Sequence, residues 1–122
     1  MTKLPLALVV ALALGAAVVH AQNEVVYRAG GGVSEPQLVK SVTPQYTGEA
    51  MRHKITGAAV LEAVVKPDGT VDDVTVTRSL DREYGLDDSC VRALKQWTFK
   101  PGMKDGKAVP VRVDVTMTFT MN

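Results

Sequence analysis

The last part of the chain alternates apolar and polar residues more regularly than any other part. Between Ala108 and Met121 every second residue is apolar, and the residues between them are mostly polar. A period of two places successive side chains on opposite faces of a strand, so this pattern predicts one long strand with a buried face and a wet face. The predicted buried face carries Val109, Val111, Val113, Val115, Met117, Phe119 and Met121.

Two earlier segments also alternate, and a turn sequence separates them. Residues Ala58 to Lys66 and Val71 to Ser79 predict two strands, and the first of these has apolar residues on both faces. Between them lies Pro67-Asp68-Gly69-Thr70, in which proline suits the second position of a tight turn and glycine the left-handed conformation. The two strands are therefore expected to form a hairpin, with the first in the centre of the sheet.

Between the hairpin and the last strand, the spacing of the apolar residues changes to three and four. This spacing predicts a helix from Leu86 to Gln96, with one apolar stripe formed by Leu86, Cys90, Ala93, Leu94 and Trp97. The helix must end before Pro101, because proline disfavours helical geometry at the residue that precedes it. A second, two-turn helix, capped by Thr47, is predicted before the first strand.

The connections between these elements determine the order of the strands. The helix returns the chain along the sheet, so the last strand can pair antiparallel only with the first strand of the hairpin. The predicted fold class is α+β, with a three-stranded antiparallel sheet in the order second, first, third. The last strand is then an edge of this sheet.

The first forty residues predict two segments that precede the folded domain. Met1 to Ala21 combines a basic residue, Lys3, with an apolar run over residues 4–19 and small residues at its end, which is the architecture of a signal peptide. The alternative is an uncleaved N-terminal anchor, although the run is shorter than the ~20 apolar residues of a typical membrane span. Residues 22–40 contain three consecutive glycines and are predicted to be a flexible linker, which leaves 41–122 as the domain.

Composition excludes several classes of function. Fourteen Lys and Arg residues balance thirteen Asp and Glu residues in a chain of 122, so there is no basic footprint for nucleic acid. A single cysteine, Cys90, excludes an intrachain disulfide, and its place on the helical stripe predicts a buried, inert thiol. Beyond the leader there is one histidine, His53, and no clustered spacing of metal ligands. We therefore expect no enzymatic activity, no cofactor and no metal site.

Several short motifs occur in an order and spacing typical of one family. They are Pro44-Gln45-Tyr46, Ile55-Thr56-Gly57, Pro67-Asp68-Gly69-Thr70-Val71, Leu86-Asp87 and Trp97-Thr98-Phe99-Lys100-Pro101. Together they resemble the C-terminal domain of TonB, the energy transducer of Gram-negative outer-membrane transport, over Ser41 to Asn122. The resemblance implies a three-stranded antiparallel sheet with two helices packed on one face.

The resemblance also implies a partner and a contact surface. TonB proteins contact the plug of an outer-membrane TonB-dependent transporter, whose extended periplasmic segment adds as a strand beside the last strand of this domain. The segment before the first helix touches the transporter as well. Carried over to this sequence, the partner-binding residues are Thr43, Pro44, Gln45, Tyr46, Arg112, Val113, Asp114, Val115, Thr116, Met117, Thr118 and Phe119.

The expected function is therefore that of a periplasmic peptide-binding module that supports energy-coupled uptake across the outer membrane. The chain departs from the family at Thr47, where proline is usual, and in its short linker, which reaches at most ~70 Å if fully extended. One alternative is a complete transducer anchored by residues 4–19 and coupled to an inner-membrane proton-channel complex. Another is a stand-alone envelope interaction domain without a role in transport. An open sheet edge also allows dimerisation through edge strands.

Overall fold

The structure, a computed structural model, describes residues 25–122. The predicted signal peptide or anchor, residues 1–21, and the first residues of the predicted linker lie outside this range. Between residues 25 and 122, no helix has the length and apolar character needed to cross a membrane.

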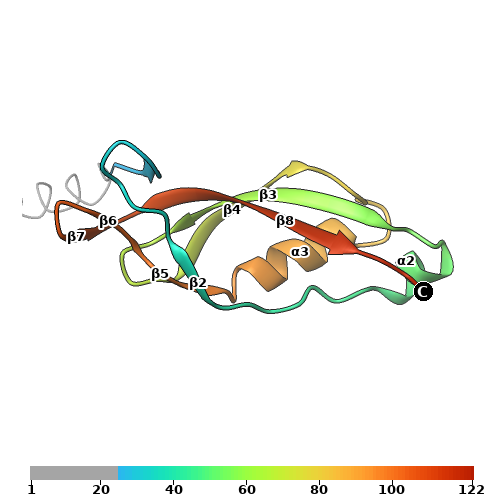
Figure 1. The fold of residues 1–122 in the computed structure, drawn as a ribbon. Helices are drawn as coiled ribbons and strands as arrows, with labels where there is room; N and C mark the ends of the chain where they lie inside the picture. The colour runs from blue at the N-terminus through green and yellow to red at the C-terminus, as the bar shows by residue number, and fades with distance from the viewer. Residues whose placement is uncertain (1–24) are drawn as a thin grey trace, which may run out of the picture.

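A four-stranded mixed sheet forms one layer of the fold (Figure 1). Its strands, in spatial order, are β1 (Tyr27–Arg28), β8 (Val111–Phe119), β3 (Gly57–Val65) and β4 (Val71–Arg78). The central strand β3 pairs antiparallel with β4 on one side and with β8 on the other. The outer side of β8 pairs with β1, and this pairing is parallel.

The prediction of a three-stranded, wholly antiparallel sheet is therefore wrong. Strands β4, β3 and β8 stand in the order second, first, third, but β1 adds a fourth strand in parallel. A strand of two residues has no periodicity that a sequence pattern can reveal. It is fixed by backbone pairing, in which the N–H of Tyr27 donates to the carbonyl oxygen of Pro110 at 2.9 Å.

The last strand is also shorter than predicted, because it is interrupted at Pro110. Proline has no N–H to donate to a ladder, and here it separates β8 from β7 (Lys107–Val109). Strand β7 instead pairs antiparallel with β6 (Gly102–Lys104) in a small hairpin. The predicted continuous strand from Ala108 to Met121 is thus two strands.

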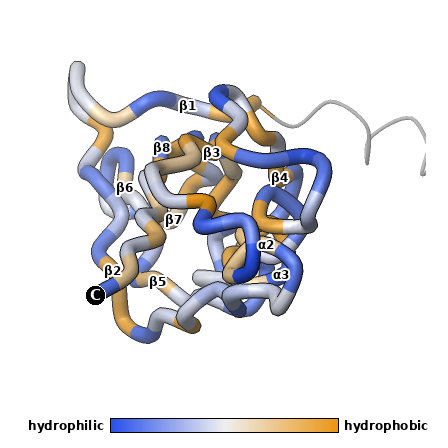
Figure 2. The backbone as a smooth tube through the Cα atoms, turned by 90° about the vertical axis from the view of Figure 1, so that its right-hand side faces the viewer, coloured by the Kyte–Doolittle hydropathy of each residue, from blue (hydrophilic) through white to orange (hydrophobic). Residues whose placement is uncertain are grey.

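Two helices pack on the sheet, α2 (Gly48–Arg52) and α3 (Leu86–Leu94). Thr47 caps α2, as predicted, by accepting a hydrogen bond from the N–H of Ala50 at 3.1 Å. Figure 2 shows both helices on the same side of the row formed by β8, β3 and β4. Helix α3 ends at Leu94, two residues before the predicted end at Gln96.

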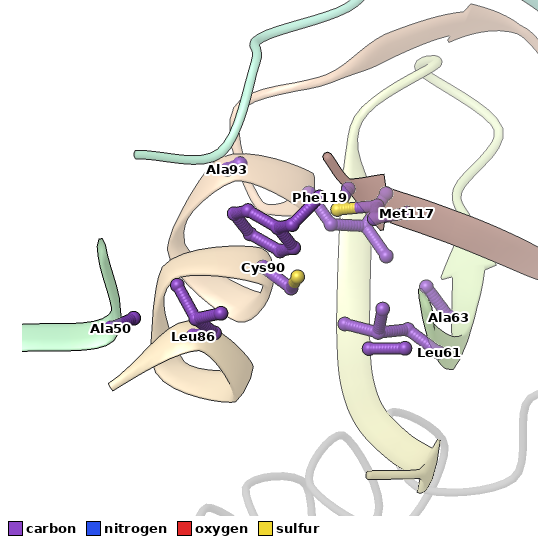
Figure 3. Close-up of a cluster of buried hydrophobic side chains, with 10 residues drawn as sticks. Ala50, Leu61, Ala63, Leu86, Cys90, Ala93, Met117 and Phe119 are labelled. Atoms are coloured by element: carbon purple, nitrogen blue, oxygen red, sulfur yellow. The ribbon is translucent and has the colours of Figure 1, made fainter. Parts of the chain in front are cut away.

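The core lies between α3 and the sheet (Figure 3). Apolar side chains of α3 contact those of β3 and β8, and Ala50 of α2 joins the same cluster. Its fully buried members include Leu61, Leu86, Cys90 and Leu94. Burial, together with the nearby carboxylate of Asp87, raises the pKa of the Cys90 thiol to about 11, so this cysteine is not a nucleophile at neutral pH.

Part of the segment predicted to be a linker is paired with the domain. Besides β1, it supplies β2 (Gln37–Lys40), which pairs antiparallel with β5 (Thr98–Lys100). Val33, which lies in the sequence between β1 and β2, is only 7% exposed. Residues 27–40 therefore pack on the domain in the structure.

Two carboxylates organise the loop between β4 and α3. Asp87 accepts hydrogen bonds from the Ser79 hydroxyl at 2.5 Å and from the N–H groups of Leu80 and Asp81, both at 3.0 Å. Asp81 accepts from three N–H groups further along the loop, at 2.9–3.1 Å. Burial opposes the charge of Asp87, but its hydrogen bonds outweigh this and hold the pKa of its carboxyl below the ordinary value.

Asp87→Asn should lower the free energy of unfolding by about 2 kcal/mol at pH 7, because hydrogen bonds to a charged acceptor contribute ~1.5–3 kcal/mol. Since the folded-state pKa is depressed, the contribution of Asp87 is complete above the ordinary pKa of 3.8 and is lost as the pH falls through the lower folded-state pKa. Urea unfolding over a pH series measures this. The matched control is Asp88→Asn, an exposed carboxylate in the same turn. A deficit for Asp87→Asn that stays constant into strong acid would contradict the assignment.

Gly69→Ala should be more damaging than Gly106→Ala, although both glycines have positive φ angles, 86° and 77°. A Cβ at Gly69 would lie 2.2 Å from the carbonyl oxygen of Phe99, whereas nothing lies within 4 Å of one at Gly106. The left-handed conformation costs ~1–2 kcal/mol in both variants, and the backbone clash adds ~1–3 kcal/mol at residue 69. If urea unfolding gives the same loss in free energy of unfolding for both variants, the turn after β3 can shift away from β5.

Candidate partner-binding edge

The outer edge of β8 has a closed part and an open part. At its start, β1 pairs with Val111 and Arg112. From Val113 to Phe119, none of the strands within residues 25–122 pairs with this edge. The predicted site on β8 is therefore open to a partner strand from Val113 onward, while the edge at Arg112 is occupied by the chain itself.

Alternation along β8 determines which backbone groups face the open edge. The carbonyl of Pro110 points outward, because it accepts the N–H of Tyr27. Successive residues of a strand direct their N–H and C=O groups to opposite sides, so those of Asp114, Thr116 and Thr118 point outward as well. The residues between them direct these groups toward β3, with which β8 is paired along its whole length.

The side chains along this edge leave it unobstructed. Asp114, Thr116 and Thr118 are exposed, whereas Met117 and Phe119 are buried in the core. The residues whose backbone groups face a partner thus carry side chains on the wet face, away from the core. Threonine favours strand conformation, so the open edge is already in the conformation that a partner strand would need.

A network of charged side chains crosses the wet face beside the closed part of the edge. Arg28 contacts Glu62 at 2.5 Å and Asp114 at 3.3 Å. Arg112 contacts Glu62 at 3.3 Å and Asp73 at 3.4 Å. Exposed ion pairs contribute only ~0–1 kcal/mol each, so the network mainly orients side chains across four strands. A groove of about 340 Å³ beside it is lined by Arg28, Ala29, Glu35, Arg112, Val113 and Asp114.

The second predicted contact, Thr43 to Tyr46, runs along α3 rather than along β8 (Figure 1). Alternate residues of this extended segment are half-buried or exposed, and Thr43 and Gln45 are the exposed ones. The indole N–H of Trp97 donates to the carbonyl oxygen of Val42 at 2.8 Å, which ties the start of the segment to the end of α3. Thr43 and Gln45 line a groove of about 240 Å³ together with Val42, Ser89, Arg92, Ala93 and Gln96.

The two predicted contact regions meet at the C-terminal end of β8. There the ring of Tyr46 packs edge-on against the ring of Phe119, with 5.1 Å between the ring centroids. The hydroxyl of Tyr46 also donates to the carbonyl oxygen of Ile55, which fixes the ring. Phe119 is buried in the core cluster and the half-buried Tyr46 packs against it, so the two rings join the two predicted contact regions.

Sequence reasoning missed Arg28 and the strand that carries it. The only signal was the short apolar patch Val25-Val26-Tyr27 beside three glycines, which does not reveal a pairing partner 84 positions away in the sequence. Within residues 25–122 no three His, Cys, Asp or Glu side chains are grouped so as to hold a metal ion. His53 stacks on Tyr84, with 4.2 Å between the ring centroids, which gives it a packing role.

Comparison with known proteins places this fold among proteins of one kind. A family profile described as "Gram-negative bacterial TonB protein C-terminal" matches residues 42–121. Protein tonB2 of Pseudomonas aeruginosa is 34% identical over 79 residues, which cover 65% of this chain and 29% of the relative. Protein TonB of Vibrio cholerae is 31% identical over 90 residues, which cover 73% of this chain and 36% of the relative. The chain thus spans about a third of the length of these relatives.

A solved structure supports the same fold. The solution NMR structure of the Pseudomonas aeruginosa TonB CTD superposes with a TM-score of 0.58 at 22% sequence identity. The superposition covers 76% of this chain and 90% of that one.

Trp97→Phe should loosen the segment before α2 while keeping an aromatic ring in place. The variant loses the indole hydrogen bond to Val42, so we expect the free energy of unfolding to fall by about 1–2 kcal/mol and the NMR order parameters of residues 43–46 to decrease. Gln45→Ala, an exposed change on the same segment, is the control and should alter neither quantity. Unchanged order parameters in Trp97→Phe would mean that other contacts hold the segment.

Proposed function

The chain belongs to the TonB C-terminal domain family, and from that premise we propose that it is a periplasmic peptide-binding module. Its partner is an outer-membrane TonB-dependent transporter, whose extended periplasmic segment adds as a strand to the outer edge of β8. Through this contact the module supports energy-coupled uptake across the outer membrane. The activity is binding, and no side chain is assigned a catalytic role.

The observation that carries this proposal is the open edge of β8 from Val113 to Phe119. Unpaired N–H and C=O groups at a sheet edge recruit another strand, and natural proteins usually protect such edges with charge, proline or a covering segment. Here three residues with outward backbone groups, Asp114, Thr116 and Thr118, have no strand partner within residues 25–122. Only one of them is charged.

The energetics of strand addition predict a weak and transient complex. Three residues with outward backbone groups offer at most about six hydrogen bonds, each contributing ~0.5–1.5 kcal/mol. Ordering a disordered segment consumes ~2–5 kcal/mol of this gain. The expected dissociation constant is therefore micromolar or poorer, as suits a contact that forms and breaks during each uptake event.

The groove beside Thr43 and Gln45 gives the same partner a second place to bind. A strand that pairs along β8 leaves the sheet beside Phe119, where Tyr46 connects the edge to the segment along α3. The groove is lined by polar residues of that segment, of α3 and of the turn after α3, together with Val42 and Ala93. Residues of the transporter that flank the added strand at this end can therefore contact Thr43 and Gln45 without a change in the fold.

Thr116→Pro should weaken binding of a short peptide from a transporter's periplasmic N-terminal segment by about tenfold, because it removes one outward N–H donor and puts a proline ring in the path of the partner. Thr116→Val is the matched control, since it keeps the N–H and the shape of the side chain, and should bind like the unmodified chain. Peptide titrations followed by amide chemical shifts give both affinities, and circular dichroism verifies that the variants are folded.

The same titration locates the contact surface. Shifts at Val113–Phe119 and at Thr43–Tyr46 are the expected result. Shifts confined to other surfaces, or equal affinities for Thr116→Pro and Thr116→Val, would overturn strand addition at β8.

A further inference from the structure

We propose that residues 27–34 form a fixed cap on the start of the β8 edge. The cap closes Val111 and Arg112 to an incoming strand and confines strand addition to Val113–Phe119. This inference rests on the proposed function, because it concerns where a partner strand stops. The family profile begins at residue 42, so the cap comes from a part of the chain that the family match does not include.

The first observation is that β1 already makes the pairing that a partner would make. Its two residues lie parallel to β8, opposite Val111 and Arg112, and the N–H of Tyr27 occupies the outward carbonyl of Pro110 at 2.9 Å. One side of a strand can hold only one neighbour. A partner therefore pairs with residue 112 only if β1 leaves.

The second observation is that the residues that follow β1 in the chain are anchored to the domain. Gly30 and Val33 exchange two backbone hydrogen bonds, at 2.8 and 3.2 Å, and the Val33 side chain is buried. Ser34 then clamps the segment to β6, since its N–H donates to the carbonyl oxygen of Met103 at 2.9 Å and its hydroxyl accepts the N–H of Met103 at 2.9 Å. Displacing β1 would strain or break these contacts. The segment is therefore expected to stay in place when a partner binds.

The third observation is that the chain turns away from the edge directly after Arg28. Gly30, Gly31 and Gly32 all have positive φ angles, of 109°, 58° and 94°, which side-chain-bearing residues rarely adopt in succession. No atom lies within 4 Å of a Cβ built at any of the three, so the glycines serve the backbone geometry rather than close packing. The turn limits β1 to two residues and leaves the rest of β8 uncovered.

Arg28 marks the boundary between the closed and open parts of the edge. Its guanidinium contacts Glu62 on β3 and Asp114, the first open residue with outward backbone groups. The side chain thus lies across the wet face where an incoming strand would end. The cap defines one end of the partner strand and in this way favours a single register.

The test compares hydrogen exchange and peptide footprints on the full chain. The probe is a short synthetic peptide with the sequence of a transporter's periplasmic N-terminal segment. At saturating peptide, we expect amide shifts that begin at Val113 and an unchanged exchange rate for the N–H of Tyr27. Faster exchange of Tyr27 on binding would show that β1 is displaced, which would overturn the cap while leaving strand addition intact.

A variant tests the boundary directly. Tyr27→Pro removes the N–H that bonds to Pro110, and should extend the footprint to Arg112 and tighten binding by about two- to tenfold, the equivalent of one added hydrogen bond. Val26→Pro is the matched control, because the N–H of Val26 donates to no backbone acceptor within the described residues. Faster exchange of the N–H groups of residues 28–34 in Tyr27→Pro would show that the cap is released, and a footprint that still begins at Val113 in that released variant would overturn the cap. Absence of peptide shifts along β8 in every variant would overturn the proposed function, and the cap with it.

Discussion

The unbroken antiparallel pairing of β3 with β8 is the constraint on which the rest of the structure depends. Nine residues of each strand pair in register, from Gly57 with Phe119 to Val65 with Val111. Because β3 is also paired with β4, it is closed on both sides, and α3 can pack its apolar stripe on a rigid surface formed by Leu61 and Ala63. The same register determines which backbone groups of β8 turn outward, so core packing and the candidate site follow from one ladder.

An exposed strand edge is both a binding surface and a hazard, since it can pair with any other edge. Covering the whole edge of β8 would abolish strand addition, and leaving it bare would also expose the outward-facing backbone groups of Arg112 and the carbonyl of Pro110 to unspecific pairing. Here the chain covers Val111 and Arg112 with β1 and leaves the remainder open. Pro110 also limits the exposed edge, because it separates β8 from β7 and β8 therefore starts at Val111, beside the cap.

The elements with long periodic patterns could be predicted from the sequence, and the short ones could not. Strands β3, β4 and β8 and helix α3 each repeat a period of two or of three to four over eight or nine residues, which is long enough to identify the type of element. Strand β1 has no period, because its position depends on backbone hydrogen bonds and a glycine turn. The candidate edge followed from the family resemblance, but Arg28 did not. Arg28, on a strand that no pattern reveals, contacts Asp114, while Arg112 contacts Glu62 and Asp73.

Under the proposed function, a weak edge and a shallow groove together can still select a partner. The two surfaces meet where Tyr46 packs on Phe119, so a segment that binds one is delivered to the other at an effective concentration of the order of millimolar. Neither contact then needs high affinity, and each can dissociate quickly. Backbone pairing on β8 depends little on the partner's sequence, because nearly every residue of a peptide offers the same backbone donor and acceptor. Discrimination between partners therefore falls to the cap, which limits register, and to the polar lining of the groove beside Thr43 and Gln45.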